Sequence, residues 1–249
     1  MHLSRLAFLA PLTLALAACG NADEPAAGAS GAVEGEAIAA IPAPAGSSWL
    51  EIASKTEQGG FVLGNPDAPI KLVEYASHTC AHCATFAETA TAALQEEYIS
   101  SGRVSFEIRP IFLNPLDVAI DVLAQCGTPT SYHGLSDQVW GSLDQITGTM
   151  QNNPAAFEAA MSAPPEQRFV SLAQAGGLID FFAARGLSAD QARQCLGDTA
   201  KIEQIANQSQ TVAQADEVTG TPTFFLNGRR LDGNTWAAIE PALQSAGAR

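Results

Sequence analysis

Cys80-Ala81-His82-Cys83 is the most informative stretch of this sequence. It follows the apolar run IKLVEYA at 70–76, which is typical of a central β-strand, and it opens a helix-like run that extends to about Tyr98. A cysteine at this junction lies beside the partial positive charge and unpaired N–H groups of a helix N-terminus. That environment stabilises the thiolate, which is the reactive form. The pair therefore predicts thiol–disulfide exchange, with Cys80 reactive and Cys83, one turn later, able to close on it.

A metal site is the alternative interpretation of these cysteines. A structural zinc site needs a further pair of Cys or His ligands at suitable spacing, and no second CxxC occurs in the sequence. We therefore predict no metal and no cofactor. A metal-binding chaperone that uses Cys80, Cys83 and His82 remains an alternative function.

The first residues have the features of an export signal. Arg5 gives a positive start, Leu6–Ala18 is apolar but short for a membrane span, and small residues lead directly to Cys19. This pattern predicts a lipoprotein signal at 1–18 with acylation of Cys19; an ordinary secretory signal is the alternative. Both predict export to an oxidising compartment, where disulfides persist.

The remaining chain divides by composition. Residues 19–48 are rich in Ala, Gly, Pro and Glu and poor in large apolar side chains, which predicts a disordered tether. Residues 49–249 are long enough for one domain with a good core. The formal net charge of −14, from 26 Asp and Glu against 12 Lys and Arg, predicts no nucleic-acid partner.

Two further cysteines need an assignment. The chain has five cysteines; Cys19 is assigned to the lipid, and Cys80 and Cys83 to exchange. Cys126 and Cys195 remain, and an even remainder in an oxidising compartment predicts a structural disulfide. Two buried, unpaired thiols are the alternative.

The order of expected elements indicates the fold class. Strand-like runs at 70–76 and 104–109 flank the helix after the CxxC, and this arrangement implies parallel pairing. A helix-rich block follows, and then Asn227-Gly228 between two strand-like runs predicts an antiparallel hairpin. The sequence therefore predicts an α/β fold, a mixed central sheet flanked by helices, with a helical insertion at about 114–217.

With the CxxC, this order and the stretch GTPTFF at 220–225, the chain resembles the thioredoxin superfamily. More closely, it resembles DsbA-type periplasmic thiol oxidoreductases of alphaproteobacteria and their relatives, over about residues 55–247. The resemblance implies a thioredoxin-like fold with Pro222 as the cis-proline beside the redox disulfide. It also implies that Thr221 offers its backbone to a bound substrate. A proline that only begins a strand is the alternative for Pro222.

Two polar residues gain expected roles from the resemblance. Glu74 matches a buried acidic residue of many members, and burial in an apolar strand would raise its pKa and suit it to exchanging a proton with Cys83. An exposed or structurally bonded Glu74 is the alternative. His82 precedes Cys83 as in oxidising members, although Ala81 stands where these have proline. There it would stabilise the Cys80 thiolate, or it would simply be solvated.

Together these features predict a thiol–disulfide oxidoreductase of the bacterial periplasm, anchored to the envelope membrane through lipid on Cys19. It would donate the Cys80–Cys83 disulfide to its partners, unfolded or reduced exported proteins. A DsbB-type membrane oxidant would reoxidise the pair. A reductase or isomerase is the alternative, although isomerases of this superfamily usually carry an N-terminal dimerisation domain, for which residues 19–48 are too poor in apolar side chains.

Overall fold

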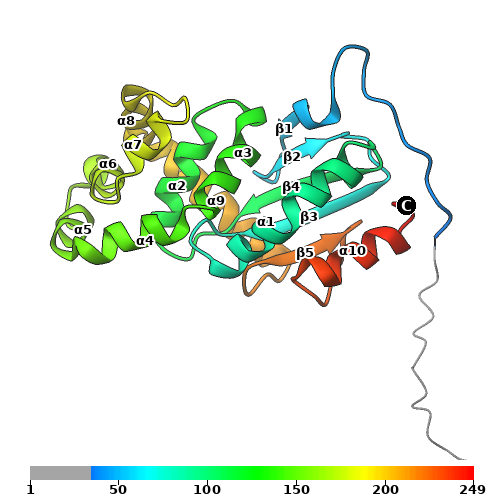
Figure 1. Cartoon of the computed structure of the whole chain (residues 1–249). Helices are drawn as coiled ribbons and strands as arrows, with labels where there is room; N and C mark the ends of the chain where they lie inside the picture. The colour runs from blue at the N-terminus through cyan, green and yellow to red at the C-terminus, as the bar shows by residue number, and fades with distance from the viewer. Residues whose placement is uncertain (1–34) are drawn as a thin grey trace, which may run out of the picture. The chain divides into compact units, whose positions relative to one another are not determined.

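The computed structural model describes residues 35–249 (Figure 1). The predicted signal at 1–18 and the predicted lipidation site Cys19 lie outside the described residues. Within 35–249, no helix combines the length and the apolar character that a membrane span requires.

Six strands of the described chain form one mixed sheet in the order β1-β2-β4-β3-β5-β6. Parallel pairing joins β3 to β4, and the other neighbours are antiparallel. The strands are β1 (Ala53–Lys55), β2 (Phe61–Gly64), β3 (Ile70–Ala76), β4 (Val104–Pro110), β5 (Thr223–Leu226) and β6 (Arg229–Arg230). The predicted mixed sheet is confirmed. β1 is not among the predicted strands, because this short edge strand is half-buried to exposed and shows no alternation of apolar side chains.

The helical insertion between β4 and β5 is also confirmed. Its helices are α2 (Pro115–Gln125), α3 (Pro129–Trp140), α4 (Leu143–Asn152), α5 (Pro154–Met161), α6 (Pro165–Ala175), α7 (Leu178–Ala183), α8 (Ala189–Gly197) and α9 (Thr199–Ala215). Outside it, α1 (Ala81–Ala93) follows β3 and continues as a π-helical segment (Leu94–Ile99), and α10 (Trp236–Ser245) ends the fold. Figure 1 shows α4 to α8 grouped away from the sheet.

The two faces of the sheet have different neighbours. Glu74 pairs in register with Phe224, whose ring packs against Phe86 of α1 with ring centroids 4.5 Å apart. Tyr75, the next residue of β3, points to the opposite face, because side chains alternate along a strand. On that face α9 covers the sheet end, where the Ser209 hydroxyl donates to the Pro110 carbonyl at 2.7 Å. Cys80 and Cys83 lie at the start of α1, so they share the face of the sheet that α1 covers with Glu74.

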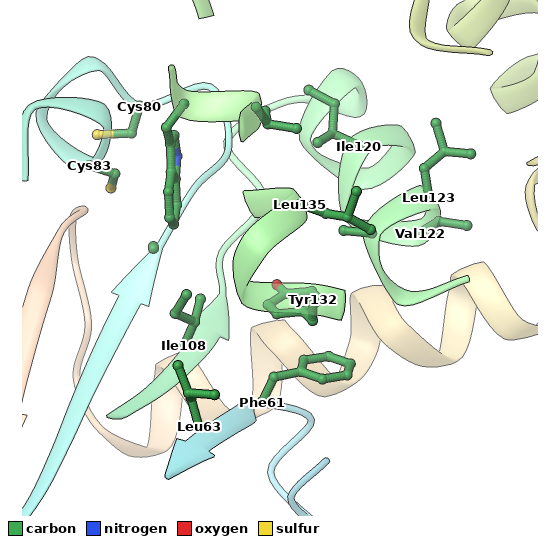
Figure 2. Close-up of a cluster of buried hydrophobic side chains, with 14 of the residues drawn as sticks. Phe61, Leu63, Cys80, Cys83, Ile108, Ile120, Val122, Leu123, Tyr132 and Leu135 are labelled. Carbon is green, nitrogen blue, oxygen red and sulfur yellow. The ribbon is translucent and has the colours of Figure 1, made fainter. Parts of the chain in front are cut away.

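The main core joins the sheet to the insertion. Figure 2 shows Phe61, Leu63 and Ile108 of the sheet beside Tyr132 of α3, with the two site cysteines at the edge of the cluster. The rings of Phe61 and Tyr132 are stacked with centroids 3.8 Å apart. Burying each large apolar side chain of this kind stabilises the folded state by about 1.5–3 kcal/mol. This shared core fixes the insertion next to the cysteines.

Residues 35–48 lie against the domain, which differs from the predicted tether of 19–48. The Ile38 amide donates to the Gly247 carbonyl at 2.9 Å, and the Ile41 amide donates to the Ser101 carbonyl at 2.9 Å. The buried Trp49 indole then donates to the Ile41 carbonyl at 2.7 Å. Low apolar content misled the prediction, because an extended segment docks here mainly through its backbone groups.

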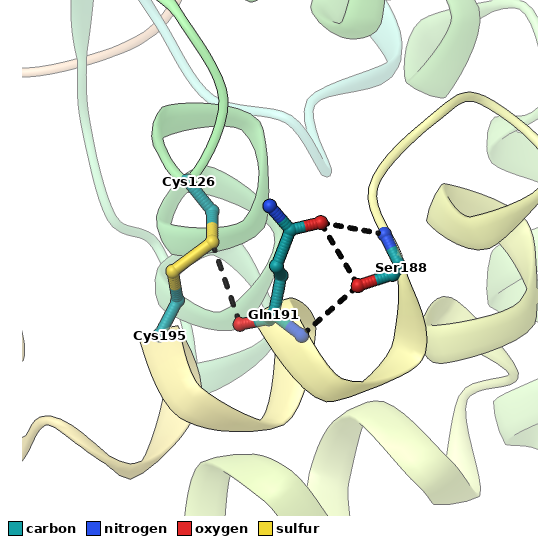
Figure 3. The surroundings of a disulfide bond; sticks show 4 residues. All are labelled: Cys126, Ser188, Gln191 and Cys195. Carbon is teal, nitrogen blue, oxygen red and sulfur yellow. Dashed lines mark hydrogen bonds between the residues drawn. A yellow bond between two sulfur atoms is a disulfide. The ribbon is translucent and has the colours of Figure 1, made fainter.

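Cys126 and Cys195 are joined by a disulfide, as predicted (Figure 3). The bond links the end of α2 to α8, 69 positions apart in the sequence. Beside it, Ser188 and Gln191 form a capping box that starts α8. The disulfide therefore ties α2, the first helix of the insertion, to α8 near its end, and it does not involve Cys80 or Cys83.

Replacing both Cys126 and Cys195 with alanine is expected to lower the melting temperature and to leave exchange activity near the wild-type rate. In the chain-entropy model, removing a disulfide that closes a loop of this length lowers the free energy of unfolding by about 4 kcal/mol. Calorimetry and a peptide thiol-exchange assay on the same protein measure the two effects. A double variant that melts like the wild type, or that loses exchange, would show that the bond is not simply structural.

Candidate active site

Cys80 lies at the N-cap of α1, where the strand-to-helix junction predicted it. Its side chain keeps 9% of its surface exposed, whereas Cys83 in the first turn has none. Both are thiols in this structure, and Figure 2 shows the two side chains together at the start of the helix. Cys80 is thus the sulfur that a partner molecule can reach, and Cys83 is its covered neighbour.

The two thiols have opposite pKa shifts. A hydrogen bond from the Cys83 thiol lowers the pKa of Cys80 to about 5; burial acts in the other direction, and the backbone N–H groups of His82 and Cys83 add to the lowering. Burial raises the pKa of Cys83, as do its bond to Cys80 and the nearby Glu74 carboxyl. At neutral pH the site therefore holds one thiolate, on Cys80, beside one protonated thiol.

The loop before β5 closes the site from the other side. The Thr221–Pro222 peptide bond is cis, as the resemblance implied. The Cys80 sulfur lies 3.3 Å from the Thr221 carbonyl oxygen, to which it donates when it is protonated. The Thr223 hydroxyl donates to the Gly220 carbonyl at 2.7 Å and fixes the loop. The structure therefore brings Thr221 and Pro222 next to the reactive sulfur, as expected.

Glu74 is buried on the sheet face that α1 covers, with 1% of its surface exposed. Its Oε1 atom has no hydrogen-bond partner among the described residues. Burial raises the pKa of this carboxyl well above its ordinary value, and the negative charges of Asp137 and Cys80 raise it further. The exposed alternative for Glu74 is thus wrong, and the residue is a buried acid that interacts electrostatically with both cysteines.

The two histidines near the pair occupy different environments. His82 is exposed on the first turn of α1. The ring of His78 is buried, stacks on Trp140 and is bonded to Ser136 at 2.9 Å; burial lowers its pKa to about 3. Across residues 35–249 no group of three or more His, Cys, Asp or Glu side chains is placed to hold a metal ion.

No local sequence pattern indicates the residues that hold the turn before Cys80. Asp117 of α2 and Trp140 of α3 both bond to this turn, at Ser77. Asp117 follows Asn114-Pro115, an N-cap and first-position proline that mark a helix start. The pattern locates α2, but it gives no sign that an acidic residue of its first turn reaches back across the fold.

The fold and the paired cysteines define a thiol–disulfide oxidoreductase. Residues 56–245 match the family model described as Thioredoxin. The chain therefore belongs to the thioredoxin family, and its similarity is to DsbA-type members.

Named proteins support this placement. The crystal structure of a protein-disulfide isomerase from Novosphingobium aromaticivorans has a TM-score of 0.69 and 28% identity, over 74% of this chain and 95% of that one. A variant of alpha-DsbA1 from Wolbachia pipientis has a TM-score of 0.53 and 25% identity, over 66% of this chain and 73% of that one. A Rickettsia bellii protein, provisionally named a protein-disulfide oxidoreductase, is 24% identical over 79% of this chain and 68% of its own length.

Proposed function

We propose that this oxidoreductase works as an oxidant that donates the Cys80–Cys83 disulfide to reduced exported proteins. The observation that carries the proposal is the pKa of Cys80, lowered to about 5. A thiolate that the fold stabilises favours the reduced form of the pair. The disulfide is then easily reduced, so it passes readily to a substrate. A reductase such as thioredoxin has a less stabilised thiolate, with a pKa of about 7.

The proposed exchange proceeds in two steps. A substrate thiolate attacks the Cys80 sulfur, forms a mixed disulfide and expels Cys83, which takes up a proton because its own pKa is raised. The buried acid Glu74 is the proposed proton donor. A second substrate thiolate then attacks the substrate sulfur of the mixed disulfide. Cys80 leaves as a stabilised thiolate, and the substrate gains one disulfide.

The backbone at Thr221 is the proposed substrate-binding edge. Its carbonyl faces the Cys80 sulfur at 3.3 Å, so a peptide held there as an added strand would bring its cysteine next to the reactive atom. His82, exposed one residue before Cys83, is proposed to contact the substrate or to stabilise the thiolate. Substitutions at Thr221 and at His82 test these proposed roles.

The periplasm, with a lipid anchor at Cys19, is the proposed location. The signal-like start and the small residues before Cys19 support it, and the Cys126–Cys195 disulfide fits an oxidising compartment. A DsbB-type membrane oxidant is the proposed partner that regenerates the disulfide. Mass spectrometry of Cys19 in protein from the envelope membrane tests the anchor.

The reduced protein is expected to be more stable than the oxidised protein, and the difference is expected to depend on pH. The pKa of Cys80 is about 5 in the fold against an ordinary value of 9.0. A lowered folded pKa gives stabilisation that is complete above the ordinary value and is lost as pH falls through the folded value. The advantage of the reduced form should therefore grow from pH 5 to pH 9 and vanish below about pH 5.

Urea unfolding of both forms across that range measures this difference. Groups that titrate in both forms, such as Asp121 with its pKa raised to about 7 by burial, cancel to first order in the comparison. An oxidised form that is the more stable one at pH 7 would count against an oxidant and in favour of the reductase.

A further inference from the structure

A buried carboxylate from the insertion makes most of the side-chain hydrogen bonds that hold the turn leading into the active-site helix. Asp117 has no exposed surface. Its Oδ1 accepts from the Ser77 hydroxyl at 2.8 Å and from the Thr79 backbone N–H at 2.8 Å. Its Oδ2 accepts from the Thr79 hydroxyl at 3.0 Å and from the Leu113 backbone N–H at 2.8 Å. All four positions around the carboxylate are therefore filled by donors.

The donors require an acceptor at this position. The N–H groups of Thr79 and Leu113 can only donate, and a buried N–H without a partner is costly. The Thr79 N–H is shared between Asp117 at 2.8 Å and the Ser77 hydroxyl oxygen at 3.1 Å, whereas the Leu113 N–H donates to Asp117. The Thr79 hydroxyl also accepts from the Asn114 side-chain amide at 2.8 Å, so its own hydrogen is free to point at Asp117. A charged carboxylate satisfies this set completely, whereas an amide would place its NH₂ group against the Leu113 N–H.

The same turn determines where Cys80 stands. The Cys80 amide donates to the Ser77 carbonyl at 3.2 Å, and that carbonyl also accepts from the Trp140 indole at 3.0 Å. Thr79, whose backbone and hydroxyl both bond to Asp117, directly precedes Cys80. The sulfur lies beside the partial positive charge and N–H groups of the first turn of α1 only as long as Cys80 keeps its N-cap position.

We propose that Asp117 is a positioning residue for the redox reaction: it holds the Ser77–Thr79 turn so that the Cys80 sulfur stays at the helix N-terminus and opposite the Thr221 carbonyl. Asp117 itself touches neither sulfur nor substrate in this role. The insertion thereby contributes to the reactivity of a cysteine that lies outside it. The role concerns the thiolate of Cys80 and applies whichever way the exchange runs.

Replacing Asp117 with asparagine is the direct test, with the pH profile of Cys80 alkylation in the reduced protein as the readout. A looser turn lets the Cys80 sulfur move away from the helix N-terminus. The midpoint of the alkylation profile is therefore expected to rise by about one pH unit, which is a tenfold change in the acid dissociation constant of the thiol. The alkylation rate at pH 5 should fall several-fold. The intrinsic stability of the fold does not enter this readout as long as the protein is folded.

Asp121→Asn is the matched control. Asp121 lies one turn further along α2, is equally buried, and accepts from the Tyr132 hydroxyl at 2.7 Å. Its hydrogen bonds go to Tyr132 and Gln125 and not to the turn before Cys80, so its loss should lower the melting temperature without moving the alkylation midpoint. A midpoint that moves as far in Asp121→Asn as in Asp117→Asn would reduce Asp117 to a general stabiliser and overturn the proposal.

Thr79→Val keeps the test decisive if Asp117→Asn does not fold. It removes the hydroxyl's bonds to Asp117 and from the Asn114 amide but keeps the backbone N–H bond to Asp117, so a smaller shift in the same direction is expected. An unchanged midpoint in folded Asp117→Asn contradicts the proposal. So does an unchanged midpoint in Thr79→Val, if that is the variant which folds.

Discussion

Replacing Cys80 with alanine is expected to abolish thiol–disulfide exchange, with a loss on the order of 10³-fold or more, as when a nucleophile is removed. Cys83 cannot take over, because burial raises its pKa and leaves it with no exposed surface. Replacing Cys83 with alanine has a different expected result. Without Cys83 the Cys80 thiolate can still attack a disulfide of a partner protein and expel one partner thiolate, but Cys83 is no longer there to break the resulting mixed disulfide, so covalent complexes accumulate.

Peptide exchange kinetics and non-reducing gels of the two variants measure these effects. The matched control is the Cys126→Ala, Cys195→Ala protein, which lacks two sulfurs but keeps the site. Trapped complexes in the Cys80→Ala protein, through Cys83, would reverse the assignment of the two cysteines.

Alkylation of the reduced protein at pH 6 is expected to label Cys80 and leave Cys83 unmodified on the same timescale. With a pKa of about 5, Cys80 is mostly thiolate at pH 6, whereas an ordinary thiol is ionised only at about one part in 10³. A thiolate of low pKa is also a weaker nucleophile, with a Brønsted coefficient of about 0.4–0.5, which offsets part of the gain. Cys80 is therefore expected to be alkylated about tenfold faster than an ordinary exposed thiol. Its rate advantage over the buried Cys83 is larger.

Peptide mapping after a short pulse of iodoacetamide gives the ratio of the two labels. The same pulse on urea-unfolded protein is the control, because both thiols then have similar pKa values and should label at similar rates. Equal labelling in the folded protein would mean that the helix start does not activate Cys80.

The parts of the fold predicted from the sequence are those with local signals. The apolar run at 70–76 before the CxxC predicts a central strand and helix start, and Asn227-Gly228 marks the hairpin between β5 and β6. The cis bond at Pro222 came only from the family resemblance, since most X-Pro bonds are trans. Cys126 and Cys195 were paired by counting, and the structure joins them.

What the sequence did not predict depends on contacts between distant segments. Asp117 meets Thr79, 38 positions earlier in the chain, and nothing in either local pattern signals the contact. Residues 35–48 look disordered by composition, yet they dock through backbone bonds to Ser101 and Gly247.

The equilibrium of the Cys80–Cys83 pair against a series of glutathione buffers tests the central claim most directly. A pair with a stabilised Cys80 thiolate should be reduced by mild buffers, with a potential above about −180 mV, the range of disulfide donors. The reduced fraction can be followed by alkylation and mass spectrometry, with the Cys126–Cys195 bond as an internal reference. A potential near about −270 mV, the range of thioredoxin, would contradict the account and make this protein a reductase.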